Sequence, residues 1–329
     1  MRQASKSVRK HILALLSDGH FHSGETIAQQ VGLSRTAVAG HISQLSDWGL
    51  DVFKVKGKGY RLERGFSLLN AESIKKHLGN SKRAMIDVES VLPSTNTEMK
   101  KRIANARHEL ADGDAIFAEI QTAGRGRHGR TWLAPIGGSL TFSMYWSFPD
   151  GYQSMAGLSL MVGLAVCEAL KDFGVDDAEL KWPNDIYLQG KKLAGILIEV
   201  EGQIGATAHS VIGMGLNVCV PDSQYDVGQP HSDLTSYLGH TPDRNSLAAA
   251  IIKSLWTLLP KFTQQGFGPF APHWEALDLY ADKRIVLQMG EKRFSGIDRG
   301  VDASGALLVE TQDGITRFHG GEVSLRGNR

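Results

Sequence analysis

The residues best suited to chemistry form the segment Gly124–Gly129, which reads GRGRHG and lies between Gln121 and Trp132. Its three glycines allow backbone N–H groups to approach a ligand, while Arg125 and Arg127 add positive charge that does not titrate off. The segment is neither a GxxxxGK[ST] motif nor a GxGxxG motif that opens a helix. It favours binding of a phosphate or of a phosphoryl group that develops negative charge. A flexible basic surface loop is the alternative.

A second group of polar side chains is suited to an uncharged ligand. Ser94-Thr95-Asn96 places donors and acceptors side by side, as an amide or ureido head group requires. The alternative role of this triplet is the N-cap of a helix that begins near Glu98. The strand predicted over 115–121 would deliver Gln121 to the mouth of the glycine–arginine loop.

Further along the chain, Lys181–Asp185 reads KWPND, which places the Asp185 carboxylate at a turn. The proline restricts this segment to an edge or to the end of a strand. Lys192 opens an alternating strand over 192–199, although in isolation it would be an ordinary surface lysine. The glycine-rich strand 212–217 leaves room for a flat ligand.

The N-terminal region has the pattern of a winged helix-turn-helix. Ser23 and Ser34 precede two short apolar-periodic helices, which are separated by a turn that contains Gly32. We expect Gly49 to cap the end of the second of these helices. The following segment 52–62 alternates around a Gly-x-Gly turn and predicts a hairpin, or wing.

Charge distribution favours DNA as the partner of this module. The chain has 329 residues and a formal net charge of +1, but residues 1–64 hold ten Lys/Arg against five Asp/Glu, a net charge of +5, which leaves −4 for the rest. A protein–protein module with a basic face is the alternative. The expected DNA-contacting residues are Ser23, Ser34, Arg35, Thr36, His41, Gln44, Lys56 and Lys58.

Composition predicts a cytoplasmic protein that does not enter a membrane. The two cysteines, Cys167 and Cys219, stand in apolar contexts typical of core packing rather than of a disulfide framework. No stretch approaches the roughly 18 uninterrupted apolar residues of a membrane-spanning helix.

The coarse pattern of elements predicts an α+β fold. Beyond the winged module, strands over 115–121 and 138–146, a helix over 152–173 and the strands described above predict a central mixed or antiparallel sheet with helices. Short strands after Gly290 predict a small C-terminal β-barrel. We therefore expect domains at 1–64, 65–276 and 277–329.

Taken together, these motifs identify a resemblance. Ser94–Asn96, Gln121 with Gly124–Gly129, Lys181–Asp185 and Lys192–Gly195 follow in this order behind a winged helix-turn-helix, and the chain ends with the segment 320–325, which reads GGEVSL. The chain closely resembles, nearly from end to end, the bacterial bifunctional biotin–protein ligases that are also biotin operon repressors. The resemblance implies a class II synthetase-like catalytic fold and an SH3-like C-terminal barrel.

The resemblance also implies two half-reactions and a regulatory role. Biotin and MgATP would give biotinyl-5′-AMP, and a lysine of the biotin carboxyl carrier protein of acetyl-CoA carboxylase would then receive the biotinyl group. The adenylate would also act as corepressor and promote a homodimer that binds operator DNA. ATP with Mg²⁺, biotin and the adenylate are therefore the expected small-molecule ligands.

Site residues follow from the resemblance by position. Biotin would be held by Ser94, Thr95, Asn96, Gln121, Arg125, Gly126, Arg127 and Lys192. ATP or the adenylate would contact Gly124, Arg125, Arg127, Trp132, Asn184 and Asn217. The catalytic residues would be Arg127, Lys192 and Asp185, and Asp185 would either hold Mg²⁺ or help to deprotonate the acceptor lysine. A core position for Trp132 is the alternative to a place at the ligand loop.

One segment departs from the family pattern. Family repressors often place an aromatic residue in a second loop over the adenylate, which here falls at 224–234 and contains Gly228–Ser232 but no Trp. Retention of the adenylate, and its coupling to dimerisation, are therefore expected to be weaker. Two rival functions remain open from the sequence: a biotin-sensing transcription regulator without catalysis, and a lipoate-type ligase.

Overall fold

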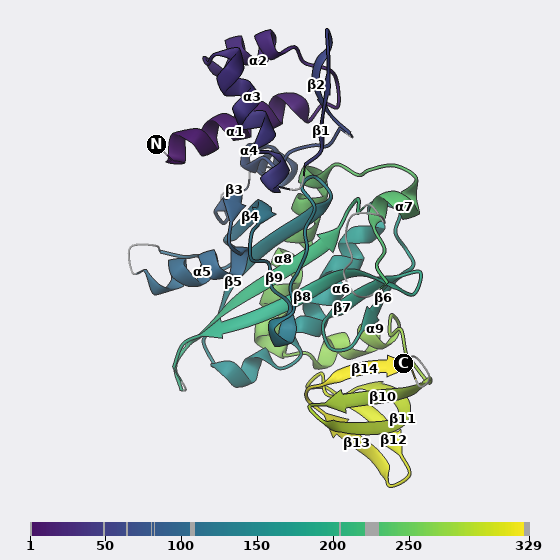
Figure 1. Ribbon diagram of the computed structural model, residues 1–329. Helices are drawn as coiled ribbons and strands as arrows, with labels where there is room; N and C mark the ends of the chain where they lie inside the picture. The colour runs from purple at the N-terminus through teal and green to yellow at the C-terminus, as the bar shows by residue number, and fades with distance from the viewer. Residues whose placement is uncertain are drawn as a thin grey trace.

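The computed structural model describes residues 2–48, 50–63, 65–79, 81, 83–105, 109–203, 205–220 and 230–325. Figure 1 shows three parts in chain order: a helical part with a hairpin, a large sheet flanked by helices, and a C-terminal sheet. The N-terminus lies at one end of the molecule and the C-terminus near the other.

The N-terminal part is the predicted winged helix-turn-helix. It comprises helices α1 (Arg2–Leu16), α2 (Gly24–Val31) and α3 (Arg35–Ser43), followed by the antiparallel hairpin of β1 (Val52–Val55) and β2 (Gly59–Leu62). The Ser23 hydroxyl accepts from Thr26 N and the Ser34 hydroxyl from Ala37 N, so both serines are N-caps. The helices pack around a shared apolar core that includes Ile12, Leu16, Ile27, Val38 and Leu45.

The predicted end of α3 is wrong. The helix stops at Ser43 and a 3-10 turn, Ser46–Trp48, follows it. The Ser43 hydroxyl donates to Gly40 O and the Ser46 hydroxyl to Ser43 O, and such side-chain bonds compete with the backbone pattern of a helix. Gly49, the predicted cap, lies outside the described residues.

The central sheet has seven strands in the order β3-β4-β5-β9-β8-β7-β6. Only the β3–β4 pair is parallel, so the sheet is mixed, as predicted. The strands are β3 (Ile86–Leu92), β4 (Ala115–Gln121), β5 (Ser139–Phe148), β6 (Ala178–Lys181), β7 (Asp185–Leu188), β8 (Lys191–Glu201) and β9 (Ala208–Asn217).

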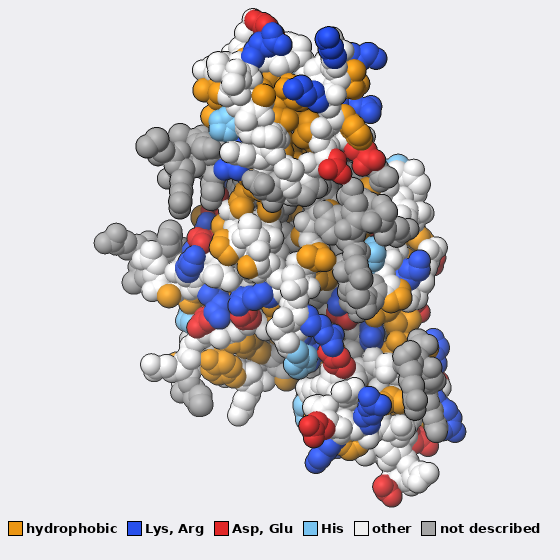
Figure 2. All heavy atoms as spheres, viewed as in Figure 1, with side chains coloured by type: hydrophobic (Ala, Val, Ile, Leu, Met, Phe, Trp, Pro, Cys, Tyr) orange, Lys and Arg blue, Asp and Glu red, His pale blue; other side chains and the backbone are white. Residues whose placement is uncertain are grey.

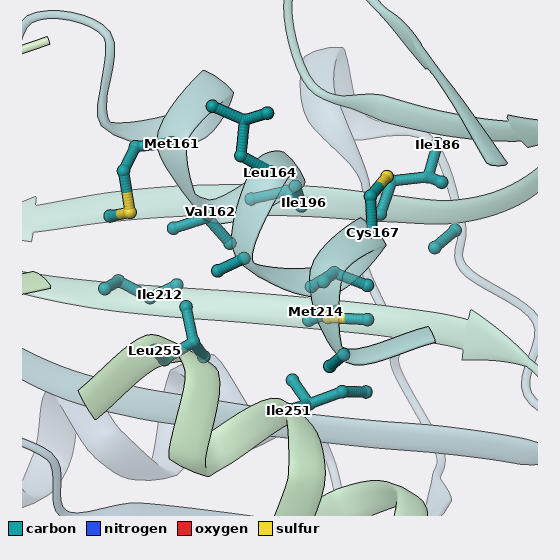
Figure 3. Packing of buried hydrophobic residues seen from close by; sticks show 14 of the residues in the cluster. Met161, Val162, Leu164, Cys167, Ile186, Ile196, Ile212, Met214, Ile251 and Leu255 are labelled. Carbon is teal, nitrogen blue, oxygen red and sulfur yellow. The ribbon is translucent and has the colours of Figure 1, made fainter. Parts of the chain in front are cut away.

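Two long helices pack against each other beside this sheet and build most of its core. Figure 3 shows side chains of α6 (Leu158–Lys171), such as Val162 and Cys167, close to strand residues Ile196 and Met214, with Ile251 and Leu255 of α8 (Arg244–Gln265) beside them. Helix α5 (Thr95–Ala104) packs against β5, β8 and β9. The shorter helices are α4 (Ala71–His77), α7 (Leu234–Leu238) and α9 (Ala271–Glu275).

The single helix predicted over 152–173 is in fact two elements. A 3-10 turn, Tyr152–Met155, precedes α6, and Gly157 with φ +80° separates them. A Cβ at Gly157 would lie 2.5 Å from the Phe267 ring, so the break also admits a core aromatic residue. Within the described residues, the segment Tyr152–Lys171 is long and apolar enough to cross a membrane, but it lies mostly inside the core, which accounts for its composition.

The C-terminal part is an antiparallel sheet of five strands in the order β13-β12-β11-β10-β14. These strands stand where the sequence predicted a small barrel: β10 (Arg284–Met289), β11 (Lys292–Val301), β12 (Leu307–Thr311), β13 (Gly314–Phe318) and β14 (Glu322–Leu325). The Trp182 indole donates to Gly305 O at 3.1 Å, which joins this sheet to the central part close to the KWPND segment.

A buried ion pair fixes the chain between the winged part and the central sheet. Arg244 at the start of α8 and Glu119 of β4 have side chains 1% and 5% exposed, and they approach to 2.9 Å. Arg244 also donates to Ser67 O and Ser139 O, and the Leu69 N–H donates to Glu119. Loss of one partner from such a pair leaves an uncompensated buried charge.

We predict that Glu119→Gln lowers the free energy of unfolding by about 3–5 kcal/mol, because Arg244 would keep a buried charge without its counter-ion. Urea denaturation of the full chain measures the change. Glu72→Gln is the matched control, because it breaks the exposed Glu72–Lys75 pair and should cost less than about 1 kcal/mol. Equal losses from the two substitutions would contradict a stabilising role of the buried pair.

Candidate active site

One cavity of about 920 Å³ gathers most of the residues that the sequence singled out. Its volume lies in the range of small-molecule and cofactor sites. Of the predicted ligand residues, those on its wall are Ser94, Thr95, Asn96, Gln121, Arg125, Gly126, Arg127, Trp132, Asn184, Asp185 and Lys192. The C-terminal sheet closes one side with Gln288, Glu322, Val323 and Ser324.

Gly124 and Asn217 do not line this cavity. Gly124 is buried, and a Cβ there would lie 2.4 Å from Trp132 O, so this glycine permits a close backbone crossing. Asn217 donates to Lys192 O and Ser232 O from the end of β9. Ser232 N in turn donates to Lys192 O at 2.9 Å. Asn217 therefore supports the backbone that presents Lys192 instead of facing the cavity.

One end of the cavity is polar and nearly uncharged. Thr95 N donates to the Gln121 side-chain oxygen at 2.8 Å, and the Thr95 hydroxyl lies 2.7 Å from the Ser143 hydroxyl. The Ser143 hydroxyl also lies 2.5 Å from Asn96 Oδ1. Ser94 precedes α5 but makes no side-chain cap bond, so its hydroxyl remains available for a ligand.

The sequence reasoning missed Ser143. This serine is fully buried on β5, where alternation places it with Ser139, Thr141 and Ser147 on the face opposite the apolar side chains. Only the register of β5 against β4 and β9 places it beneath Thr95 and Asn96. The alternation of hydroxyl-bearing and apolar residues along β5 was the one available signal, and by itself it does not show which hydroxyl meets the ligand residues.

The other end of the cavity is cationic, and most of its cations are paired with an acidic or amide oxygen of the chain. Lys192 Nζ lies 2.8 Å from Asp185 Oδ1, and Arg127 donates to Asn184 Oδ1 at 2.9 Å. Arg130 pairs with Glu322 of β14 at 2.7 Å. The Asn184 amide in turn donates to Ile196 O at 2.7 Å, which fixes the oxygen that receives Arg127.

Burial and these partners shift two pKa values. Burial lowers the pKa of the Arg127 guanidinium, against the attraction of Asp185 and Glu322. Burial also acts to raise the pKa of Glu322, but the hydrogen bond and charge of Arg130 outweigh it, and the pKa of Glu322 is lowered. A partly desolvated guanidinium binds an anion more strongly than an exposed one.

Two glycines make room for Trp132. A Cβ at Gly215 would lie 2.2 Å from the indole, and one at Gly195 would lie 3.3 Å from it. Lys192 Nζ stands 5.9 Å from the centre of the ring. The sequence expected Trp132 either at the ligand loop or in the core; it lies on the cavity wall, half-buried against β8 and β9.

The cis peptide between Trp182 and Pro183 lies between edge strand β6 and β7. The predicted turn therefore exists, and Asp185 begins the next strand. Among the described residues no three His, Cys, Asp or Glu side chains gather as a metal site. In the described chain, the carboxylates on the cavity wall are those of Asp185 and Glu322.

The winged part presents a separate basic surface. Arg35, Thr36 and Gln44 of α3 are exposed, as are Lys56 and Lys58 at the hairpin turn, whereas His41 is half-buried. Figure 2 shows Lys and Arg side chains distributed over this end of the molecule. The hydroxyls of Ser23 and Ser34 are already engaged as helix caps.

Comparison with known proteins agrees with this architecture. Residues 88–217 match the biotin/lipoate A/B protein ligase family, residues 8–61 an HTH domain and residues 281–326 the biotin protein ligase C terminal domain. The bifunctional ligase/repressor BirA proteins of Escherichia coli and Salmonella typhimurium are each 44% identical over 96% of both chains.

A solved structure also matches. The biotin protein ligase from Aquifex aeolicus in complex with biotin and ATP is 30% identical, with a TM-score of 0.63 over 75% of this chain and 99% of that one. The chain therefore belongs to the family of bifunctional ligase/repressors whose catalytic domain is of the biotin/lipoate A/B protein ligase type.

Packing around Gly213 yields a prediction. A Cβ at Gly213 would lie 2.1 Å from Asn96 Oδ1, so Gly213→Ala must displace a buried amide. We expect a loss of about 1–3 kcal/mol of unfolding free energy in urea denaturation. Gly40→Ala in α3, where a Cβ meets nothing within 4 Å, is the control and should not destabilise the chain. Unchanged stability of Gly213→Ala would show that the amide is not held in this position.

Proposed function

We propose that this protein activates biotin with ATP to biotinyl-5′-AMP and transfers the biotinyl group to a lysine of the biotin carboxyl carrier protein of acetyl-CoA carboxylase. The observation that carries the proposal is that one cavity joins an uncharged polar end to a cationic end. An acid with a polar uncharged head, joined to a nucleotide through its carboxyl group, has this distribution of charge.

The polar end suits the ureido ring of biotin. Ser94, Thr95, Asn96 and Gln121 supply hydroxyl and amide groups that both donate and accept, with little net charge. The glycines of β9 let Asn96 and Trp132 lie against the sheet, since a Cβ at Gly213 would meet Asn96 and one at Gly215 would meet Trp132. The flat head group would lie between these two side chains, both of which line the cavity.

The cationic end suits the reacting groups. The biotin carboxylate attacks the α-phosphorus of ATP, a bond to oxygen forms, and pyrophosphate leaves with the electron pair of the broken P–O bond. Arg125, Gly126, Arg127 and Lys192 would hold the carboxylate and the charged phosphoryl oxygens, so that the developing charge meets preorganised donors. Trp132 and Asn184 would contact the nucleotide. Gly124 and Asn217 would support the site without touching the ligand, because Gly124 packs against Trp132 O and the Asn217 amide donates to Lys192 O.

Besides Lys192, Asp185 would have Mg²⁺ as a partner in the first half-reaction. It lies 2.8 Å from Lys192 and faces the cavity, which favours it as the protein ligand of the Mg²⁺ that enters with ATP. In the second half-reaction the same carboxylate would help to deprotonate the acceptor lysine, whose free pKa is about 10.4. The amine then attacks the acyl carbon, and AMP leaves.

We propose that the adenylate is also the corepressor. It would order the Gly124–Gly129 loop and promote a homodimer that pairs two winged parts on operator DNA. The exposed residues Arg35, Thr36, Gln44, Lys56 and Lys58, together with the half-buried His41, would contact that DNA. We propose domain boundaries at 1–64, 65–276 and 277–329, and a cytoplasmic protein without a membrane partner.

The direct test of the ligase is mass spectrometry of a biotin carboxyl carrier domain after incubation with the protein, biotin and MgATP. One biotinyl group per carrier, dependent on ATP, is the expected result. An unmodified carrier would favour a biotin sensor without catalysis. Preferential transfer of lipoate in a competition assay would favour the lipoate-type ligase.

Arg127→Gly should release activated biotin. Its guanidinium is half-buried at the cavity wall and held by Asn184, so its loss removes a donor to the phosphoryl group and a support of the loop. A mixed anhydride that is no longer enclosed meets water and stray amines. Filter binding of labelled adenylate should show a dissociation rate at least ~10-fold faster, by analogy with the loss of one charge-assisted hydrogen bond. Adenylate retained as tightly as in the wild type would refute this role.

The wing should contribute phosphate contacts without sequence information. The double substitution Lys56→Gln and Lys58→Gln should weaken binding to operator DNA and to unrelated DNA to a similar degree. It should reduce the slope of log K against log salt by about 2 for each winged part, or about 4 for the homodimer. Electrophoretic mobility shift at several salt concentrations measures both. Lys283→Gln, in the C-terminal part of the chain, is the control and should leave the slope unchanged. A loss of affinity for the operator alone would contradict the proposal that these lysines contact DNA phosphates.

A further inference from the structure

Glu199 of β8 links the two ends of the cavity although it does not line the cavity itself. Its side chain is 21% exposed, and Oε2 accepts from Asn96 Nδ2 at 2.8 Å and from Arg125 Nη2 at 3.0 Å. Its other oxygen lies 3.4 Å from Lys100 Nζ. One carboxylate therefore receives the amide of the polar end and the first arginine of the glycine–arginine loop.

The contact with Asn96 fixes the orientation of that amide. An ionised carboxylate only accepts hydrogen bonds, so Nδ2 of Asn96 must face Glu199, and it also donates to Leu197 O at 3.2 Å. The amide oxygen then lies 2.5 Å from the Ser143 hydroxyl and next to Gly213, at the place that a Cβ would occupy. The contact with Glu199 thus orients the Asn96 amide so that its oxygen, and not its nitrogen, faces Ser143.

The contact with Arg125 ties the start of the loop to the sheet. Arg125 is 44% exposed, and within the described chain its guanidinium donates to Glu199 and to the Thr97 hydroxyl at 3.2 Å. The loop closes on itself further along, where Gly126 N donates to Arg130 O at 2.7 Å. The tether at Arg125 therefore holds the first residues of the loop while leaving the remainder to other contacts.

Neighbouring Glu201 offers a comparison within the same strand. It also pairs with Lys100, at 2.9 Å, but none of its contacts reaches Asn96 or Arg125 in the described structure. Because Lys100 is shared by both acids, loss of either one leaves this lysine with a counter-ion. The two glutamates therefore share the Lys100 partner and differ in their connection to the cavity.

We propose that Glu199 is a positioning residue for ligand binding: by holding Asn96 and Arg125 at once, it sets the distance between the groups that bind the head of the ligand and those that bind its carboxyl end. This inference rests on the proposed function, because it takes biotin as the ligand whose two ends are held.

The test compares Glu199→Gln with Glu201→Gln in the full chain. A glutamine at 199 can accept from Asn96 or face Arg125, but it cannot pair with the guanidinium charge. Titration calorimetry with biotin should give a dissociation constant raised about 10- to 100-fold for Glu199→Gln, as expected for hydrogen bonds to charged groups, and less than about 3-fold for Glu201→Gln. Glu199→Asp, which keeps the charge on a shorter side chain, should lie between them.

A double-mutant cycle separates positioning from general loss of stability. If Glu199 acts through Arg125, then Glu199→Gln in an Arg125→Gln background should add less than its separate effect. A second measurement needs no ligand. Trypsin should cut the untethered loop of Glu199→Gln at Arg125 or Arg127 several-fold faster than in wild type and in Glu201→Gln, because untethered loops are the preferred sites of proteolysis. Thermal unfolding of each variant identifies any that fails to fold.

The outcomes are distinct. Wild type that does not bind biotin overturns the proposed function. Wild type that binds biotin, with Glu199→Gln and Glu201→Gln equal to each other in affinity or in tryptic cleavage, overturns the role of Glu199 alone. Additive effects of the Glu199 and Arg125 substitutions also overturn it.

Discussion

The site depends on electrostatic balance among cations that must face a ligand yet remain stable without one. Lys192 is balanced by Asp185, Arg130 by Glu322 and Arg125 by Glu199, whereas Arg127 rests on the neutral oxygen of Asn184. In the proposed reaction, an incoming phosphate would replace or join these partners. Since the Arg127 guanidinium donates to an uncharged group and is partly desolvated, a ligand anion would stabilise it strongly.

The charged and polar residues of the site come from four separate stretches of the chain. β4 delivers Gln121 and the loop. The turn before β7 delivers Asn184, and β7 itself begins with Asp185. β8 delivers Lys192 and Glu199, and β14 delivers Glu322. These stretches meet because β8 lies between β7 and β9, and because the C-terminal sheet is joined to the KWPND turn through Trp182. The C-terminal part therefore completes the cavity wall.

Local patterns were sufficient to predict much of this arrangement. Capping serines, alternating strands and the glycine–arginine loop have signals within a few residues, and the structure confirms the winged part and the mixed sheet. Long-range pairing was not predictable: Ser143, Glu199 and the Arg244–Glu119 pair act through partners 47 to 125 residues away. The break before α6 was missed because the residue packed against Gly157 is Phe267, which is remote in sequence.

The measurement that bears most directly on the paired cations is exchange of labelled pyrophosphate into ATP, which reports the adenylation step without a carrier. The account predicts exchange that requires biotin and is lost when Lys192 is replaced by methionine. Exchange that proceeds equally without biotin, or that survives the loss of Lys192 unchanged, would contradict the proposal that this cavity joins biotin to the nucleotide.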